Sequence, residues 1–167
     1  MSAGETLADN GRTMNAMSEA ELVRRARELA ERAHAGQVDK AGAAYVEHPA
    51  RVARRVAGDG GDAAAVAAAW LHDVLEDTPV EDAELAAAFP APVVAAVRAL
   101  TRLPGQDLDD YYAAVRADPI AVRVKRADLA DNTDPARLAR LDDATRERLT
   151  AKYARAAAAL ETGRRQW

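Results

Sequence analysis

The segment from residue 63 to about residue 77 constrains the fold most, because it reads as a strongly apolar helix. Every side chain over 63–71 is apolar. A helix that is apolar around its circumference is buried inside a protein, so we expect this one to be the central helix of the domain. The larger apolar side chains of the segment are Val66, Trp70, Leu71, Val74 and Leu75. Its polar residues gather at its end, and they are His72, Asp73, Glu76 and Asp77.

Further helical segments follow one another along the chain, and their ends carry recognisable signals. Ser18 followed by Glu21 is a capping box, and it starts a first helix that ends near Gly36. A second helix begins near His48 and ends by the glycine-rich turn at 58–61. The remaining segments are 81–88, 92–100, 108–116, 120–132 and 142 to about 161, and prolines punctuate the chain between them.

No segment has a convincing strand pattern, because the abundant Ala, Leu, Arg and Glu residues favour helix at most positions. The 167 residues suffice for one ordinary domain with its own core. We therefore predict an all-α fold, a single compact helical bundle over 18–162. Residues 1–17 lack periodicity and are predicted to be a flexible N-terminal leader, with 163–167 as a C-terminal tail.

Composition excludes several classes of function. The net charge of −4 and the pI near 5.4 give no electrostatic footprint for a nucleic-acid polymer or an anionic membrane surface. The chain has no cysteine, so any metal ligands must be His, Asp or Glu. There is no apolar run of transmembrane length and no signal-peptide pattern at the start, which predicts a cytoplasmic protein.

His72 and Asp73 point to a metal ion. An imidazole beside a carboxylate is costly to bury in an apolar helix, and a divalent cation would offset that cost because both groups donate lone pairs to it. Neighbouring helical residues project about 100° apart, so both can reach one ion only at the boundary between their directions. Glu76 and Asp77 lie one turn further on and are candidate proton-transfer carboxylates.

Two residues elsewhere in the chain could complete the site. His48 stands at a predicted helix start, and Asp128 stands within the predicted helix 120–132. Together with His72 and Asp73 they would form a set of two nitrogen and two oxygen ligands, with positions left for water or substrate.

The order His48, His72-Asp73, Asp128 resembles the defining pattern of HD-domain metal-dependent phosphohydrolases. More locally, five blocks resemble the hydrolase domain of the bifunctional RelA/SpoT alarmone enzymes and their small stand-alone relatives. The blocks are 33–37 (AHAGQ), 45–49 (YVEHP), 71–78 (LHDVLEDT), 100–103 (LTRL) and 124–128 (VKRAD). The resemblance runs from about residue 34 to residue 132, and its five blocks in the right order make it specific.

The resemblance implies an activity and a set of roles. The activity is hydrolysis of a phosphate ester or pyrophosphate bond in a nucleotide-like substrate, with guanosine 3′,5′-bis(diphosphate) 3′-pyrophosphohydrolase as the leading reaction. Metal ligands would be His48, His72, Asp73 and Asp128, and the divalent metal is usually manganese in the alarmone branch. Glu76 and Asp77 match the acidic pair that activates or orients the attacking water. Asn132 matches a residue that contacts the nucleotide and its phosphates.

Two departures from the alarmone hydrolases affect the substrate. The alarmone hydrolases have an Arg-Lys pair after the first block, where this chain has Asp39-Lys40. They also have a basic residue shortly after the asparagine that corresponds to Asn132, and this chain has Asp134 there. Both changes remove positive charge where a nucleotide with four phosphates would gain from it. Lys40 and Lys125 are the leading remaining candidates for phosphate contact, although Lys125 could instead be an ion-pair partner on its own helix.

Other interpretations stay open. The enzyme could act on another small nucleotide or phosphorylated metabolite, or the chain could be a non-catalytic metal-binding module that senses a ligand. Retention of Glu76 and Asp77 favours the enzyme, and a homo-oligomer is left open. Asp131 and Asp134 are expected to be surface or capping groups. His34 could support the site or stabilise the end of the first helix.

Overall fold

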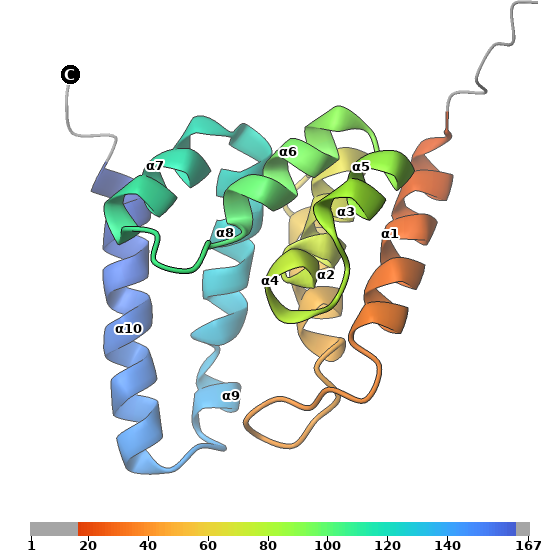
Figure 1. The fold of residues 1–167 in the computed structure, drawn as a ribbon. Coiled ribbons are helices and arrows are strands. Elements are labelled where there is room, and N and C mark those ends of the chain that lie inside the picture. Colours follow the sequence, from red (N-terminus) through yellow and green to blue (C-terminus); the bar gives the residue numbers. More distant parts are fainter. Residues whose placement is uncertain (1–16, 163–167) are drawn as a thin grey trace, which may run out of the picture.

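The computed structural model describes residues 17–162, and every regular element within that range is a helix (Figure 1). In chain order the helices are α1 (Glu19–Ala33), α2 (Glu47–Gly58), α3 (Ala63–Leu71), α4 (Val74–Asp77), α5 (Asp82–Ala88), α6 (Ala91–Leu100), α7 (Leu108–Ala117), α8 (Pro119–Asn132), α9 (Pro135–Leu138) and α10 (Asp143–Glu161). The predicted all-α fold is confirmed. None of the helices in this range is long and apolar enough to cross a membrane.

The first helix begins where the capping box places it. The Ser18 side chain accepts a hydrogen bond from the backbone N–H of Glu21 at 3.1 Å. The predicted leader over 1–17 and tail over 163–167 lie outside the described residues, apart from Met17, which packs partly buried against the core. The face that α1 turns inward consists of Leu22, Ala26, Leu29 and Ala30.

Helix α3 occupies the centre of the bundle, as its apolar sequence predicts. It packs against α1, α2, α6 and α8. Ala67, Ala68 and Ala69 are fully buried, and their small side chains let neighbouring helices approach closely. Asp62 caps the helix by accepting a hydrogen bond from the Ala65 N–H at 2.8 Å.

The predicted helix over 63–77 is wrong at one point, because it breaks at His72 and Asp73 into α3 and α4. In a continuous helix the carbonyl of Ala69 would accept the N–H of Asp73. Here the ring Nδ1 of His72 lies 2.7 Å from that carbonyl oxygen. Asp73 takes φ −104° and ψ −1°, which is a sparsely populated backbone region. The break therefore coincides with the two residues that carry the candidate chemistry.

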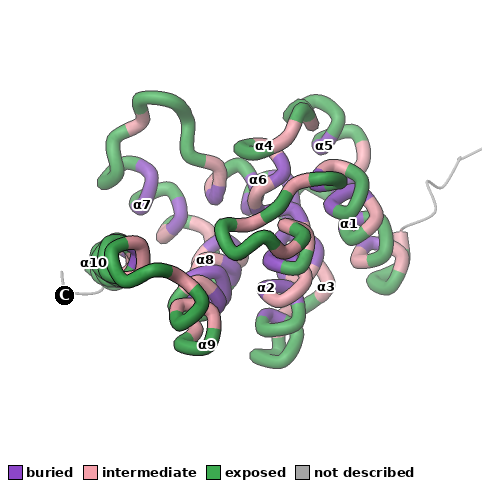
Figure 2. The backbone as a smooth tube through the Cα atoms, turned by 90° about the horizontal axis from the view of Figure 1, so that it is seen from below, coloured by how far each residue is buried: buried purple, intermediate pink, exposed green. Residues whose placement is uncertain are grey.

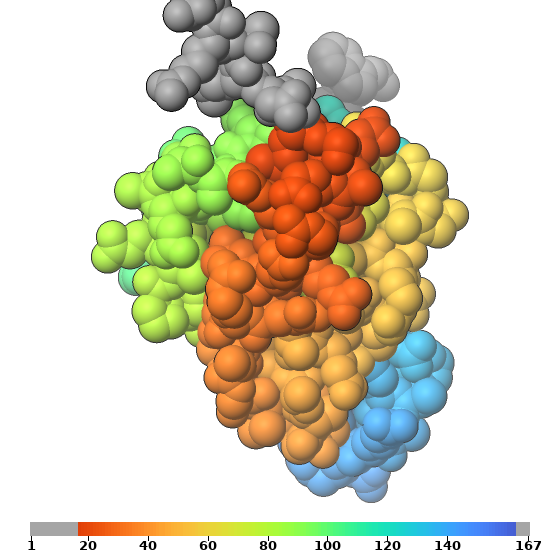
Figure 3. Space-filling model, turned by 90° about the vertical axis from the view of Figure 1, so that its right-hand side faces the viewer, coloured from red at the N-terminus to blue at the C-terminus, as the bar shows by residue number. Residues whose placement is uncertain are grey.

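Helix α8 lies beside α2 and α3 and carries the second half of the candidate site. Seen from below in Figure 2, the buried stretches of α2, α3 and α8 face one another, while α9 and α10 lie to one side. In Figure 3, the connection over 34–46, between α1 and α2, borders the blue residues that follow α8. The site thus lies where segments from both halves of the chain meet.

Candidate metal centre and substrate pocket

Four predicted ligands converge between α2, α8 and the break after α3. His48 is the second residue of α2, His72 and Asp73 form the break, and Asp128 lies on α8. His48 Nε2 lies 3.1 Å from Asp128 Oδ1 and 3.8 Å from Asp73 Oδ2. His72 Nε2 lies 3.1 Å from Asp73 Oδ2 and 3.8 Å from Asp128 Oδ1. Ligand atoms of His48, His72 and Asp128 all fall within 4.8 Å of one another.

Both imidazoles turn the same nitrogen toward this cluster. His48 Nδ1 lies 2.8 Å from Asp131 Oδ2, and His72 Nδ1 lies 2.7 Å from the Ala69 carbonyl oxygen. Each Nε2 therefore faces the carboxylates, and the buried Nε2 of His72 has no hydrogen-bond partner among the described residues. A neutral Nε2 would set its lone pair against the carboxylate of Asp73. Because a proton or a cation must lie between them, the residues present fit a divalent metal.

In this cluster, neighbouring charges shift the pKa values in the direction opposite to the effect of burial. Burial raises the pKa of a carboxyl and lowers the pKa of an imidazole. Burial would raise the pKa of Asp73, but the positive charge of the protonated His72 ring outweighs this effect and holds the pKa at about 2. The Asp73 carboxylate in turn raises the pKa of His72 to about 9 against the effect of burial. Burial also opposes ionisation of Asp128, yet Lys125 and His48 lower its pKa. The carboxylates stay charged and attract a cation.

The predicted acidic pair separates in space. The Tyr45 hydroxyl donates a hydrogen bond to Asp73 at 2.6 Å, and Asp77 Oδ2 lies 3.5 Å from the same hydroxyl oxygen. Asp77 is exposed, but the partial desolvation of its carboxyl, followed by the charge of Asp73, raises its pKa. Glu76 is exposed, and its Oε2 accepts the backbone N–H of Arg102 at 3.1 Å. Asp77 is thus linked to the cluster, whereas Glu76 holds the segment that follows α6.

Tyr45 is a site residue to which the sequence reasoning gave no role, although it opens the block that contains His48. Burial, followed by the charge of Asp73, raises its pKa, so its hydroxyl remains a donor. His34 is buried, and its ring lies 5.0 Å from the Tyr45 ring. His34 Nδ1 lies 2.8 Å from Gln37, whose amide donates to the Asp77 carbonyl at 2.9 Å. His34 therefore contacts groups that border the site.

Asp131 is the second residue that the sequence reasoning missed, and its expected surface position is wrong. It is 1% exposed and accepts hydrogen bonds from His48, from Arg51 Nε at 2.8 Å and from Arg137. These partners lower its pKa although burial opposes ionisation. Because Asp131 follows Asp128 by three residues, both lie on one face of α8, and that spacing could have revealed it.

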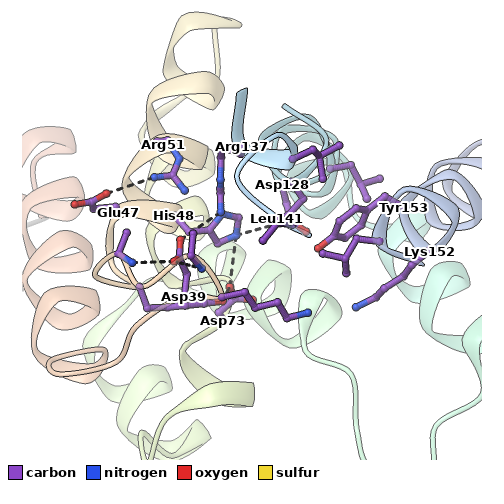
Figure 4. Close-up of a pocket in the computed structure, with 18 of the residues that line it drawn as sticks. Asp39, Glu47, His48, Arg51, Asp73, Asp128, Arg137, Leu141, Lys152 and Tyr153 are labelled. Carbon is purple, nitrogen blue, oxygen red and sulfur yellow. Dashed lines mark hydrogen bonds and ion pairs between the residues drawn. The ribbon is translucent and has the colours of Figure 1, made fainter. Parts of the chain in front are cut away.

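A pocket of about 680 Å³ opens onto His48, Asp73 and Asp128 (Figure 4). All three predicted substrate contacts line it. Lys125 Nζ lies 2.9 Å from Asp128 Oδ2, and Asn132 donates to Asp128 Oδ1 at 2.7 Å. Lys125 thus makes the ion pair that was the alternative to a substrate contact. Lys40 is exposed in the connection between α1 and α2. The wall formed by α10 and the residues before it includes Arg140, Leu141, Leu149, Lys152 and Tyr153.

Asp39 and Asp134, the two acidic residues that replace basic residues of the alarmone hydrolases, both make contacts within the protein. Asp39 accepts the N–H groups of Ala41 at 2.9 Å and Ala43 at 3.0 Å, and its Oδ2 lies 3.6 Å from Arg137 Nη2. Arg137 therefore offsets the negative charge that Asp39 brings to the pocket. Asp134 caps α9 by accepting the Ala136 N–H at 2.9 Å, which confirms its expected capping role.

Two proteins of known name are similar to this chain in sequence. The sequence is 33% identical over 121 residues to guanosine-3′,5′-bis(diphosphate) 3′-pyrophosphohydrolase from Aquifex aeolicus, covering 68% of this chain and 17% of that protein. It is 41% identical over 75 residues to the protein of the same name from Haemophilus influenzae, covering 45% of this chain and 11% of that protein. The chain therefore spans less than a fifth of the length of these relatives.

A solved structure and a family profile extend the comparison. The fold resembles that of a metazoan ortholog of SpoT, described as hydrolysing ppGpp, with a TM-score of 0.68 and 22% identity over 84% of this chain and 86% of that one. The profile of the HD domain matches residues 26–155, which is most of the chain. The protein therefore belongs to the HD-domain family.

Proposed function

We propose that this protein is a metal-dependent phosphohydrolase that cleaves a pyrophosphate or phosphate ester bond of a nucleotide, with guanosine 3′,5′-bis(diphosphate) 3′-pyrophosphohydrolase as its activity. The observation that carries the proposal is the buried Nε2 of His72, which makes no hydrogen bond among the described residues and lies 3.1 Å from the Asp73 carboxylate at the edge of the pocket. The names of the relatives from Aquifex aeolicus and Haemophilus influenzae support the same reaction.

The proposed metal ligands are His48, His72, Asp73 and Asp128. A set of imidazoles and carboxylates without thiolate suits manganese among other divalent metals, and we propose Mn²⁺ from the resemblance to alarmone hydrolases. Such an ion, when bound, lowers the pKa of water and polarises a phosphoryl oxygen.

The protein's own carboxylates would handle the proton. Glu76 and Asp77 are proposed to orient the attacking water or take its proton. Asp77 suits the second task, because its raised pKa brings it closer to the working range of a general base. The Tyr45 hydroxyl, which donates to Asp73 and lies 3.5 Å from Asp77 Oδ2, would help to fix the positions of these two carboxylates.

The pocket offers separate surfaces for the parts of a nucleotide. Lys40, Lys125 and Asn132 are proposed to contact phosphates, with Lys125 and Asn132 lying beside the metal ligand Asp128. Leu141 and Tyr153 offer apolar surface to a base or ribose on the α10 side. A volume of about 680 Å³ falls within the range of small-molecule sites.

A turnover screen tests the proposal. Purified protein supplemented with Mn²⁺ is expected to release pyrophosphate and GDP from guanosine 3′,5′-bis(diphosphate). The screen includes other small nucleotides and phosphorylated metabolites, because Asp39 replaces the arginine found in alarmone hydrolases and favours a different substrate as the second candidate. Turnover of one of those compounds alone would reassign the substrate. Metal binding without turnover of any compound would favour the ligand-sensing module.

A further inference from the structure

Asp131 is a buried carboxylate whose partners connect the candidate metal cluster to the outer wall of the pocket. Its side chain is 1% exposed, and its two oxygens contact His48, Arg51 and Arg137. Asp131 sits on the last turn of α8, three residues after the candidate ligand Asp128. Asp131 is not one of the four proposed metal ligands. A buried carboxylate needs partners that offset the free-energy cost of removing its charge from water.

The hydrogen bonds of Asp131 fix the direction of the His48 ring. An ionised carboxylate accepts only, so His48 must donate to it from Nδ1 across 2.8 Å. A neutral imidazole has one N–H, and placing it on Nδ1 leaves a lone pair on Nε2. That Nε2 is the atom that lies 3.1 Å from Asp128 Oδ1 and 3.8 Å from Asp73 Oδ2.

Two arginines hold Asp131 in this orientation. Arg51, one turn after His48 on α2, donates from Nε to Oδ1 at 2.8 Å and from Nη2 to Oδ2 at 3.2 Å. Arg137 on α9 donates to Oδ2 as well. Figure 4 shows both guanidinium groups on the side of His48 that faces away from Asp73. Because Arg51 and Arg137 have no acceptor atoms, neither can replace Asp131 as the partner of His48.

We propose that Asp131 is a positioning residue that holds His48 in the Nδ1-protonated tautomer and turns its Nε2 toward the metal. Such partners of metal-binding histidines raise ligand basicity and orient the ring. His72 differs, because its Nδ1 is held by the neutral backbone carbonyl of Ala69. The proposal rests on the proposed metal site and is independent of the substrate.

Metal affinity in the absence of substrate tests the proposal. Asp131→Asn keeps the side-chain volume but removes the charge, and Asp131→Ala removes the acceptor. Mn²⁺ titration followed by electron paramagnetic resonance should show about 10–100-fold weaker binding in both variants. Asp134→Asn is the matched control, since Asp134 is a nearby carboxylate that pairs with Arg55 at 3.5 Å and caps α9. This control should bind Mn²⁺ as tightly as the wild type.

A spectroscopic measurement separates positioning from general structural support. In long-range ¹H–¹⁵N spectra of metal-free wild-type protein, at a pH where His48 is neutral, its proton should reside on Nδ1. Asp131→Asn should shift part of the population to the Nε2-protonated tautomer. Wild-type Mn²⁺ affinity in a folded Asp131→Asn variant, or an Nε2 proton on His48 in the wild type, would overturn the proposal.

The outcomes also separate this inference from the proposed function. Weakened metal binding in the Asp131 variants of a protein that turns over no nucleotide would sustain the inference and defeat the proposed activity. A wild-type protein that binds no Mn²⁺ would defeat the metal site and this inference together.

Discussion

Replacing Lys125 with methionine tests how positive charge is shared at Asp128. Lys125 Nζ lies 2.9 Å from Asp128 Oδ2, and the two side chains are 18% and 9% exposed. Removing one partner of a buried ion pair costs about 3–5 kcal/mol, and the residual exposure places this pair at about 3 kcal/mol. For a chain of this length, that loss lowers the melting temperature of the metal-free protein by about 6–12 °C.

A bound cation changes that cost, because it would compensate Asp128 through the other oxygen, Oδ1, which faces His48 and His72. Losing Lys125 should therefore destabilise the metal-loaded protein less than the metal-free protein. By linkage, the difference between the two losses appears as tighter metal binding. A difference of about 1.4 kcal/mol corresponds to tenfold in Kd, so we expect Lys125→Met to bind Mn²⁺ about tenfold more tightly while losing turnover.

The assay combines thermal melts by circular dichroism, with and without chelator, and a Mn²⁺ titration. Lys152→Met is the matched control, because Lys152 is an exposed lysine in the wall of the same pocket and makes no ion pair with another residue in the range 17–162. The control should keep both the melting temperature and the Mn²⁺ affinity of the wild type. Unchanged or weaker Mn²⁺ binding by Lys125→Met would refute the reasoning that the ammonium and the cation compete for one carboxylate.

Three further predictions concern the proton acceptor, the metal-free site and the substrate. Asp77→Asn should lower kcat by about 10²–10⁴-fold and keep the wild-type Mn²⁺ affinity, and unchanged kcat would remove Asp77 from proton transfer. The pKa of His72 is raised from 6.5 to about 9 in the folded protein. Its contribution to the stability of chelator-treated protein is therefore fully present below pH 6.5 and lost as the pH rises through 9, and pH-dependent melts of wild type and His72→Ala should differ in that window. Asp39→Arg should lower the KM for guanosine 3′,5′-bis(diphosphate); an unchanged KM would place the nucleotide elsewhere in the pocket.

Several helix boundaries could be predicted from the sequence because their signals are local. Ser18, Asp62, Asp118 and Asp142 each accept a hydrogen bond from the backbone N–H three residues later. Such a bond depends on neighbours in the chain and hardly on the rest of the fold. The break at His72 could not be predicted in this way, because helical periodicity continues through it and the ring competes for a backbone carbonyl.

The residues of the candidate site also differ in whether the sequence carries a signal for them. The four candidate ligands could be brought together from the sequence because their residue types and order form a recognisable pattern. Tyr45 could not be found from the pattern, since its partner Asp73 lies 28 residues away in the chain. For Asp131 the three-residue spacing from Asp128 was the one local signal, because its partner His48 lies 83 residues away. An aspartate near a helix end is ordinarily exposed, and only the packing of α2 against α8 shows that this one is buried.

The metal content of the protein tests the central claim most directly. Protein purified without chelator should carry close to one divalent transition-metal ion per chain, measured by elemental analysis, and both His72→Ala and Asp128→Ala should remove it. Folding of each variant is checked by circular dichroism. A folded variant of either kind with the metal content of the wild type would contradict the assignment of these residues as ligands, and with it the account of the site.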